Sequence, residues 1–554
     1  MIHKSKDIIF LIKQFYHKHP YISDVGVFFF FFGLYFSILH GTGVVYRDDH
    51  FFYFKYSELL RTLGWERVVK GFDWNYYSQY VFGNNFDIRP SFFHLMLMPF
   101  TFFEDKLFAL KMSDIFFASI SFTLIYNALK KIKIKNAFLC TVFLFSVNLI
   151  SLKFLSGRPL VLSVGFLALE FAYASNKEYK KFAILSLLHV LVHQSSFFWP
   201  VAVSIIVEVG RYLSSYKFNI RGTIYSAFCT ILVLFYFPGL LNGLLRVQKS
   251  ISKDNALGQG VELYKRDVFD LYQLDNSLFL LFIFSITISV FIYLNKKNKN
   301  ISEGEDVPRN NVFASFLLCL FVLCGIIFIN GRFLDYFGLV LLLFIVVTLN
   351  YVVQRKLLIL EDKFKSAIVF GLWTVAIFLV VNSYITIRQS ALITDVEPIR
   401  KTSEWIMERS GEGELVFLID WSLFSPSFFF NHKNVYTMAM DPQDIKSVRP
   451  DLYWKWYNIF NNNFYCDEQI DCSDLKKNID SQKESMNEEQ KKNIDLDNAK
   501  KIVNSIKNDF KSNLIISNSK IFSDTLLMDT DDLRDSVKFR SDVNSMELSA
   551  FQLR

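Results

Sequence analysis

Long and almost uninterrupted runs of apolar residues recur along the first two thirds of this 554-residue chain. Two examples are SLFLLFIFSITISVFIYL at 277–294 and FGLVLLLFIVVTL at 337–349. A helix that crosses a bilayer needs ~20 predominantly apolar residues, and such runs are too long and too apolar for soluble core helices. We therefore predict a polytopic α-helical membrane protein with about eleven transmembrane helices. The predicted spans are 24–40, 107–129, 137–155, 160–175, 182–195, 197–211, 222–243, 276–294, 311–330, 333–353 and 366–386.

The basic residues predict how these spans are oriented. With the N-terminus inside, five basic loops fall inside, whereas the more acidic or mixed loops 41–106, 244–275 and 387–554 fall outside, as the positive-inside rule requires. The apolar segment 91–103 is short and contains Pro99, and as a full span it would move the first basic loop outside. We predict that this segment lies in the outer interface or re-enters the membrane. The five basic loops are 130–135, 176–181, 214–222, 296–300 and 354–365.

The N-terminal segment and the net charge argue against a secreted protein with a cleaved signal peptide and against a nucleic-acid-binding protein. No small-residue cleavage site follows the first apolar run, so that run is interpreted as a retained first span. The net charge of +7 comes from basic residues clustered beside spans, which is typical of membrane topology and not of a nucleic-acid-binding protein. The expected environment is a membrane, with membrane lipids and no nucleic acid as partners.

Composition changes sharply near residue 387. The chain as a whole is 52% apolar with a mean hydropathy of +0.26, yet 20% of its residues are charged. These values indicate two parts, a transmembrane module at 1–386, with interfacial helices in its external loop 41–106, and a soluble extracytoplasmic domain at 387–554.

The soluble domain has the pattern of a layered α/β or α+β fold. A helix is predicted at 398–409, followed by strand-like runs at 413–420, 434–440 and 512–519, and by a C-terminal hairpin. A charge-rich stretch at 473–500 is interpreted as helical or loose. The simplest role for this domain is a lid or docking module without chemistry of its own.

The cysteines separate into two groups. Four of the six lie within predicted spans, where a thiol is usually a small apolar filler. Cys466 and Cys472 lie close together in the soluble domain, which predicts a disulfide outside the cytosol. A metal site is less favoured there, because no histidine or further cysteine is near.

Polar residues at the outer ends of spans are the first candidates for chemistry, because a charge is costly near hydrocarbon. Asp48 and Asp49 follow the first span directly, and adjacent carboxylates there can act as a general base or hold a divalent cation. The alternative is that they cap the next helix. Arg158 and Arg332 each follow a glycine at an outer turn, where a guanidinium either binds phosphate bidentately or extends to the lipid headgroups.

Histidines and aromatic residues give weaker indications. His189 and His193 lie four residues apart on one helix face, which allows zinc binding but also hydrogen bonding between helices. His193 is nearer the outer end and is the better functional candidate. The aromatic residues at 73–100 are typical of interfacial anchoring, with stacking on a sugar ring as the alternative.

These features together resemble the GT-C superfamily of membrane glycosyltransferases, in its bacterial type. The resemblance rests on Asp48-Asp49 after the first span, an Arg89-Pro90 step in the first external loop, and the outer arginines Arg158 and Arg332. The soluble segment 403–442 also has the helix, strand and aromatic rhythm of the extracytoplasmic domain of bacterial members. The similarity covers most of the chain as a pattern and not as a strict signature.

The resemblance implies an inverting transfer of a sugar from a polyprenyl-phosphate carrier to an acceptor hydroxyl of a glycan, lipid or protein. Asp48 or Asp49 would deprotonate the hydroxyl, and Arg158, Arg332 and, as a lesser candidate, His193 would bind the lipid phosphate. Magnesium or manganese held by Asp48 or Asp49 would assist in some members.

The first external loop adds two further expectations. Asp87 and Arg89 would belong to a substrate-contacting part of that loop. The implied location is the bacterial inner membrane, with the N-terminus cytoplasmic and the soluble domain periplasmic or extracellular.

Two other functions compete with this interpretation. An O-antigen or exopolysaccharide polymerase would also place an outer-turn arginine before a sequence such as HQSS at 193–196, but usually lacks a soluble domain of this size. A transporter or flippase of lipid-linked sugars would be expected to show internal repeats and helices broken at mid-membrane. No clear repeat is present, and the candidate residues lie at one face.

Overall fold

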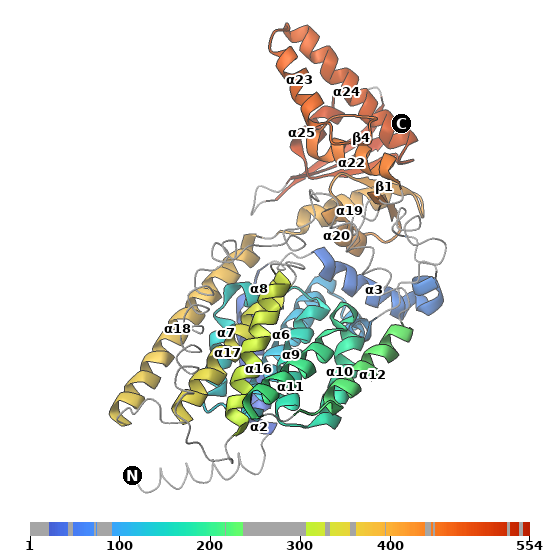
Figure 1. The fold of residues 1–554 in the computed structure, drawn as a ribbon. Helices are drawn as coiled ribbons and strands as arrows, with labels where there is room; N and C mark the ends of the chain where they lie inside the picture. The colour runs from blue at the N-terminus through green and yellow to red at the C-terminus, as the bar shows by residue number, and fades with distance from the viewer. Residues whose placement is uncertain are drawn as a thin grey trace.

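The computed structural model consists of a helical bundle and a C-terminal domain that contacts one end of the bundle (Figure 1). We call that end of the bundle the outer end and the opposite end the inner end. The structure describes residues 21–42, 48–70, 74, 91–215, 218–236, 306–326, 333–354, 362–393, 395–437, 445–446, 449–528, 532–541 and 547–554.

Most of the predicted spans coincide with helices of the bundle. The exceptions are 276–294, which lies outside the described residues, and 137–155, which forms two helices. The bundle helices are α2 (Tyr21–Leu39), α6 (Lys106–Lys131), α7 (Ala137–Phe145), α8 (Asn148–Phe154), α9 (Pro159–Ser175), α10 (Tyr179–Val192), α11 (Trp199–Ser215), α12 (Arg221–Tyr236), α16 (Asp306–Cys324), α17 (Leu334–Gln354) and α18 (Asp362–Ile393).

The bundle has the composition of a membrane protein. Within the described residues, three helical segments are long and apolar enough to cross a bilayer, at Tyr21–Leu39, Lys106–Lys131 and Gln194–Ser214. Further apolar helices are shorter, and the total of about eleven spans stays a prediction. Helix α9 is buried along nearly its whole length and packs on α6, where a Cβ at Gly165 would lie 2.9 Å from Ser121 Oγ. Small residues at this contact let the two backbones approach closely.

The predicted span at 137–155 is broken where α7 ends and α8 begins. Ser146 and Val147 separate the two helices, and the Ser383 hydroxyl of α18 donates a hydrogen bond to the Ser146 carbonyl at 2.9 Å. Ser151 Oγ donates to the Phe145 carbonyl. Side chains therefore satisfy carbonyls that leave the helical ladder, which is how a break is tolerated inside a bundle. Hydropathy alone does not show such a break.

Four further elements precede α6 in the chain, and the first of them, α3, lies across the outer end of the bundle beneath the C-terminal domain (Figure 1). The segment 91–103, predicted to be too short for a span, forms an eleven-residue helical stretch that packs against α3. Its exposed faces carry large apolar side chains, including Phe92, Leu95 and Phe102, as expected at an interface. The four elements are α3 (Asp48–Trp65), η1 (Glu66–Lys70), α5 (Phe92–Leu97) and η3 (Met98–Phe102).

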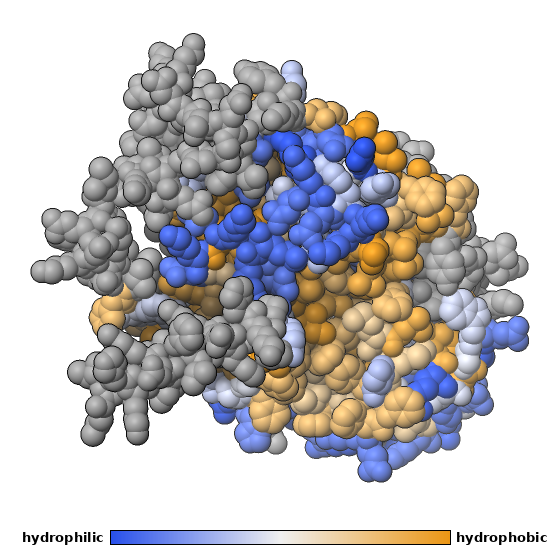
Figure 2. Space-filling view, turned by 90° about the horizontal axis from the view of Figure 1, so that it is seen from below, coloured by the Kyte–Doolittle hydropathy of each residue, from blue (hydrophilic) through white to orange (hydrophobic). Residues whose placement is uncertain are grey.

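Predicted inner loops gather at the inner end of the bundle. Lys130 pairs with Asp24 at the start of α2 at 2.8 Å, and Lys131 lies 3.6 Å from Glu178 in the next basic loop. Figure 2 views the molecule from this end and shows a hydrophilic area with apolar residues to its right and below it. The grouping agrees with the loops that the charge pattern places together, whereas the side of the membrane on which they lie stays a prediction.

The C-terminal domain is built on a five-stranded mixed sheet in the order β2-β1-β3-β5-β4. Strands β2, β1 and β3 are parallel, with Val416 paired to Tyr436 and to Leu514, and the β4–β5 hairpin runs antiparallel at one edge. Helices α19 and α20 pack on one face, and α22 and α24 on the other. The strands are β1 (Leu415–Leu418), β2 (Val435–Tyr436), β3 (Leu514–Ser517), β4 (Leu533–Arg540) and β5 (Glu547–Leu553), and the helices are α19 (Glu397–Arg409), η8 (Trp421–Leu423), α20 (Phe424–Phe430), α22 (Pro450–Asn462), α23 (Ser473–Lys483), α24 (Glu488–Asn508) and α25 (Lys520–Leu526).

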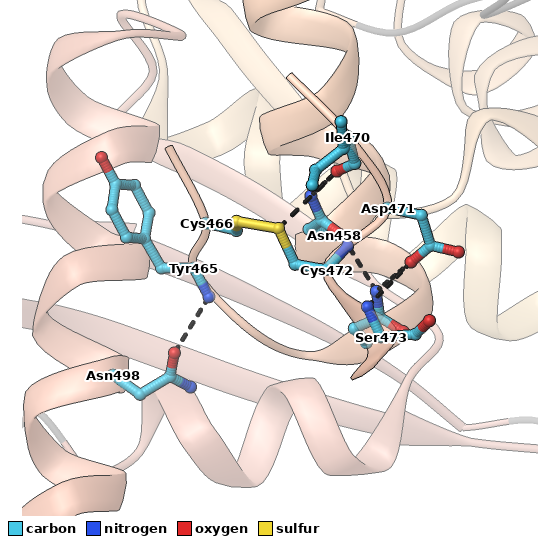
Figure 3. The surroundings of a disulfide bond; sticks show 9 residues. Asn458, Tyr465, Cys466, Ile470, Asp471, Cys472, Ser473 and Asn498 are labelled. Atoms are coloured by element: carbon cyan, nitrogen blue, oxygen red, sulfur yellow. Dashed lines mark hydrogen bonds between the residues drawn. A yellow bond between two sulfur atoms is a disulfide. The ribbon is translucent and has the colours of Figure 1, made fainter. Parts of the chain in front are cut away.

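The charge-rich stretch of this domain is helical. It forms α23 and α24, a hairpin that projects from the sheet (Figure 1). A disulfide between Cys466 and Cys472 lies at the base of this hairpin (Figure 3). Asn458 of α22 donates to the Ile470 carbonyl at 2.9 Å and accepts from the Cys472 amide at 2.9 Å, so the disulfide loop is attached to the core of the domain.

Candidate functional site

The start of α3 and the turn between α8 and α9 meet at the outer end of the bundle. Arg158 Nη2 lies 3.1 Å from Asp49 Oδ2. The Asp49 side chain is 44% exposed and that of Arg158 is 26% exposed, so the pair is accessible and not part of the core. An exposed ion pair contributes only about 0–1 kcal/mol to stability. The geometry therefore brings together a predicted base and a predicted phosphate-binding group.

The backbone of the α8–α9 turn is what places Arg158. Gly157 has a φ of +56°, a conformation that side chains with a Cβ rarely adopt. A Cβ at this position would lie 2.5 Å from Asp114 Oδ1 and 2.8 Å from His50 Cβ. Pro159 then occupies the first turn of α9, where its missing N–H costs nothing. The Gly-Arg-Pro sequence thus fits a turn pressed against two other elements.

A second pair lies directly beneath the Asp49–Arg158 contact. His50 Nδ1 is 3.4 Å from Asp114 Oδ2 of α6, and both side chains are buried. Burial, with a smaller effect of the Arg158 charge, lowers the pKa of His50 to about 3, while the backbone of Ser156 opposes this shift. The imidazole is therefore neutral at physiological pH, and it fills the space between α3, α6 and the Gly157 turn.

Asp114 is a residue that the sequence analysis missed. Its Oδ1 is buried and accepts no hydrogen bond from any of the described residues. The available signal was a lone carboxylate within the apolar segment 107–129, and such a residue in a span is by default a functional candidate. It was overlooked because nothing in the sequence connects it with His50.

His193 belongs to a separate polar cluster between α9, α10 and α17. Its Nδ1 lies 2.5 Å from Ser196 Oγ and 3.4 Å from the Tyr336 hydroxyl, and its Nε2 lies 2.7 Å from Ser195 Oγ. His189, on the same predicted face, instead contacts Glu170 and Ser163.

The two histidines therefore have separate sets of hydrogen-bonding partners. No group of three or more histidine, cysteine or carboxylate residues within the described ranges is placed to hold a metal ion. The interpretation of His189 as a helix-to-helix hydrogen-bonding residue agrees with its contacts.

Other predicted residues are only partly placed. Asp48 is the first residue of α3, while Asp87, Arg89 and Arg332 lie outside the described residues. Near Arg332 in sequence, Asp335 in the first turn of α17 forms an ion pair with Lys153 of α8. This pair, which sequence reasoning missed, fixes the start of α17 against the helix that precedes Arg158.

The C-terminal domain packs on α3 within one turn of Asp49. The Phe51 ring meets that of Phe429 at 5.2 Å between centroids, and the Phe52 ring meets that of Phe428 at 6.0 Å. Trp74, from the first external loop, donates to the His432 carbonyl at 2.6 Å. The predicted covering role of this domain thus has a direct contact surface next to the candidate site.

Fold and site together define a helical bundle, with segments long and apolar enough to cross a membrane, whose outer end carries a charged site beside an α/β domain. No protein-family model matches the sequence, and no curated protein matches it. Among solved structures, the fold is similar to that of the oligosaccharyltransferase of Archaeoglobus fulgidus in its apo form, with a TM-score of 0.57 and 10% sequence identity. The match covers 96% of this chain and 74% of that enzyme.

This likeness concerns the fold. It extends over nearly the whole chain, so the bundle, the interfacial helices and the C-terminal domain all take part. A fold alone does not determine an activity.

Proposed function

We propose that this protein is an inverting glycosyltransferase that moves a sugar from a polyprenyl-phosphate carrier to an acceptor hydroxyl at the outer end of the bundle. The observation that carries the proposal is the 3.1 Å contact between Asp49 and Arg158, at the end that the C-terminal domain covers. A carboxylate base and a phosphate-binding guanidinium are the two groups that such a transfer requires. The oligosaccharyltransferase-like fold supports the same class of reaction.

The proposed reaction uses the two residues in complementary roles. Asp49 accepts the proton of the acceptor hydroxyl, and the oxygen attacks the anomeric carbon as the bond from that carbon to the phosphate oxygen breaks. Arg158 stabilises the negative charge that develops on the departing phosphate. Because Arg158 pairs with Asp49 in the structure, phosphate binding would compete for the guanidinium and leave the carboxylate available as a base.

Asp48 stays an alternative base because it is adjacent in the chain. Arg332 and His193 are proposed as further phosphate-binding groups, and Asp87 and Arg89 as residues of the substrate-contacting loop. The acceptor class, glycan, lipid or protein, is open in this proposal, and the C-terminal domain is proposed to lie on the periplasmic or extracellular side.

A divalent cation does not find a complete ligand set here. Asp49 and Asp114 lie near the same turn, but Asp114 contacts His50 and the Gly157 turn, and the described residues offer no group of three ligands. Two carboxylates alone are a poor site for magnesium or manganese unless substrate phosphate completes it. We therefore route no step through a metal ion.

The proposal is tested by transfer from a radiolabelled polyprenyl-phosphate sugar with the purified full-length protein and cell-envelope acceptors. Asp49→Asn and Arg158→Ala are expected to lose at least 100-fold in kcat/KM, a typical range for a general base or an oxyanion-stabilising group. Arg409→Ala is the matched control, because Arg409 forms a similar 2.9 Å pair with Asp535 in the C-terminal domain.

Two results would overturn it. Full activity in both Asp48→Asn and Asp49→Asn would remove the base assignment. Movement of the lipid between leaflets without any consumption of the donor would identify a transporter instead.

A further inference from the structure

A continuous chain of hydrogen-bonding groups runs from the core of the bundle to the half-buried His193. It begins at Glu170 of α9, whose Oε1 lies 3.0 Å from His189 Nδ1. His189 Nε2 lies 2.5 Å from Ser163 Oγ, and Ser163 lies 2.8 Å from the Tyr336 hydroxyl. Tyr336 lies 2.7 Å from Ser196, which lies 2.5 Å from His193 Nδ1.

This path of hydrogen bonds connects the buried carboxyl group of Glu170 to the protein surface. Glu170 and His189 have no exposed surface, and Glu170 Oε2 has no hydrogen-bond partner among the described residues. At the other end, His193 is half-buried and its neighbour Ser195 is exposed. A buried carboxyl group in an apolar bundle is costly, and the contact with His189 offsets part of that cost. An ionisable residue inside such a helix is by default a functional candidate.

Every link between the two ends is able to reverse its direction. Each hydroxyl on the path can donate or accept, and each imidazole nitrogen can do either according to its tautomer. In one arrangement, Glu170 is a carboxylate that accepts from His189 Nδ1–H, and the hydroxyls of Ser163, Tyr336 and Ser196 all donate toward Glu170. His193, protonated on both nitrogens, then donates its Nδ1–H to Ser196.

In the opposite arrangement, each group between the two ends has passed on one proton and received another. His193 loses its Nδ1 proton, the three hydroxyls keep their number of protons, and His189 changes from the Nδ1–H to the Nε2–H tautomer. Glu170 gains one proton and becomes a neutral acid that donates to His189. No proton is created or lost, because a cationic His193 with an anionic Glu170 becomes a neutral His193 with a neutral Glu170.

We propose that Glu170, His189, Ser163, Tyr336 and Ser196 form a proton relay that sets the protonation state of His193. The titratable groups on it are Glu170 from α9, His189 and His193 from α10 and its end, and Tyr336 from α17. Aromatic rings pack against the path, with Phe166 against His189 and Trp199 against Tyr336. In this scheme Glu170 and His189 are positioning residues that act through His193.

The relay also gives His193 a role that rests on the proposed function. A lipid phosphate near His193 would favour the imidazolium, and Glu170 would supply the proton without any uptake from the aqueous phase. His193 would then bind phosphate at a pH at which an isolated histidine is mostly neutral.

The test measures His193 itself and needs no substrate. Diethylpyrocarbonate reacts with the unprotonated and not with the protonated form of imidazole, so its rate against pH, assigned to His193 and not His189 by tandem mass spectrometry, gives a midpoint pH for that residue. The full-length protein in lipid nanodiscs is compared with Glu170→Gln and Ser163→Ala. Ser163 is decisive, because among the described residues it is the one hydroxyl that bonds to His189 Nε2.

Glu170→Gln is expected to lower the midpoint by about one pH unit, the size of the effect of one charge ~10 Å away at an effective dielectric constant of about 20. Ser163→Ala is expected to shift the midpoint in the same direction although it leaves the carboxyl group in place, because it removes the aligned hydrogen bonds that stabilise the arrangement with an anionic Glu170 and a cationic His193. Ser186→Ala is the matched control, because Ser186 is buried on the same helix as His189 and, within the part of the chain that the structure describes, bonds only to the Phe182 carbonyl.

The relay is wrong if Ser163→Ala keeps the wild-type midpoint, even where Glu170→Gln shifts it, since that result would show a field effect alone. An equal shift in Ser186→Ala would also overturn it, because the effect would then not depend on the path. If Glu170→Gln does not fold, Ser163→Ala still decides. A shifted midpoint in a protein without transferase activity would keep the relay and remove the phosphate role.

Discussion

Replacement of Gly157 by alanine tests the construction of the candidate site most directly. The glycine has a φ of +56°, and a left-handed conformation costs a residue with a Cβ about 1–2 kcal/mol. In addition, the new methyl group would lie 2.5 Å from Asp114 Oδ1 and 2.8 Å from His50 Cβ. Overpacking of this kind costs about 1–3 kcal/mol, so the total expected destabilisation is about 2–5 kcal/mol.

A matched glycine separates the two contributions. Gly41 has a φ of +69° and also lies at the outer end, but apart from its chain neighbours no atom of the described residues lies within 4 Å of the position of its Cβ. Gly41→Ala therefore carries the backbone cost without the clash. The difference between the two variants, about 1–3 kcal/mol, measures how tightly the turn presses on His50 and Asp114.

The clash is also expected to impair the reaction. Relief requires the turn to move away from α3, which separates Arg158 from Asp49. A displacement of about 1 Å at a positioned group costs up to ~100-fold in rate, so transfer by Gly157→Ala should fall by at least about 10-fold. Thermal unfolding monitored by intrinsic fluorescence and the transfer assay are run on both variants. If Gly157→Ala matches Gly41→Ala in both, the turn is not constrained as described.

Three further predictions follow from single contacts. Phe428→Ala removes a buried ring that packs on Phe52 and Trp74 and should destabilise the fold by about 3–5 kcal/mol. It should also reduce transfer more than Phe510→Ala, which removes a buried ring elsewhere in the same domain. Equal losses of transfer would contradict a specific role of this interface. Replacement of both Cys466 and Cys472 by serine should lower the thermal midpoint of the C-terminal domain by the equivalent of about 2 kcal/mol while transfer persists, and alkylation with and without reductant, read by mass spectrometry, checks the disulfide. The pKa of His50 is about 3 in the fold and about 6.5 when unfolded, so between these pH values the unfolded chain binds one more proton than the folded chain, and stability, which is full above about pH 6.5, falls as the pH drops toward 3. His50→Gln should flatten this part of the curve of thermal midpoint against pH. An unchanged slope would show that His50 is not buried as a neutral group.

The sequence was sufficient to predict the features that depend on composition over many residues. The apolar runs predicted the helices, and the basic loops predicted which helix ends lie together, as the contact between Lys130 and Asp24 illustrates. The helix at 398–409 and the strand-like runs of the soluble domain were predicted close to their observed positions, because alternation of apolar residues is a local signal.

Features that depend on one contact between distant residues were not predictable in this way. Asp114 and Glu170 each stand alone in an apolar helix, and their partners His50 and His189 lie on other helices. The break between α7 and α8 depends on a hydroxyl from α18, which lies more than two hundred residues further along the chain. Asp49 and Arg158 were both predicted as site residues, but only the fold shows that one contacts the other.

The position of α3 between two cores determines how the site can open. Phe51 and Phe54 belong to the core of the bundle, whereas Phe52 and Tyr56 belong to the core that includes the C-terminal domain. Removing that domain would expose Phe52, Tyr56 and the side chains that accompany them on this face, namely Leu59, Leu60 and Trp74. At about 1.5–3 kcal/mol for each buried side chain, the cost is on the order of 10 kcal/mol.

A cost of that size makes a fully detached state very rare. Each 1.4 kcal/mol is a factor of ten in population, so a detached domain would be present in about one molecule in 10⁷. Movement of the whole domain is therefore a poor route for substrates. Because the same helix that begins with Asp48 and Asp49 carries the interface, the domain is better described as a part of the site's support than as a lid. The position of Asp49 would then depend on the domain throughout the proposed reaction.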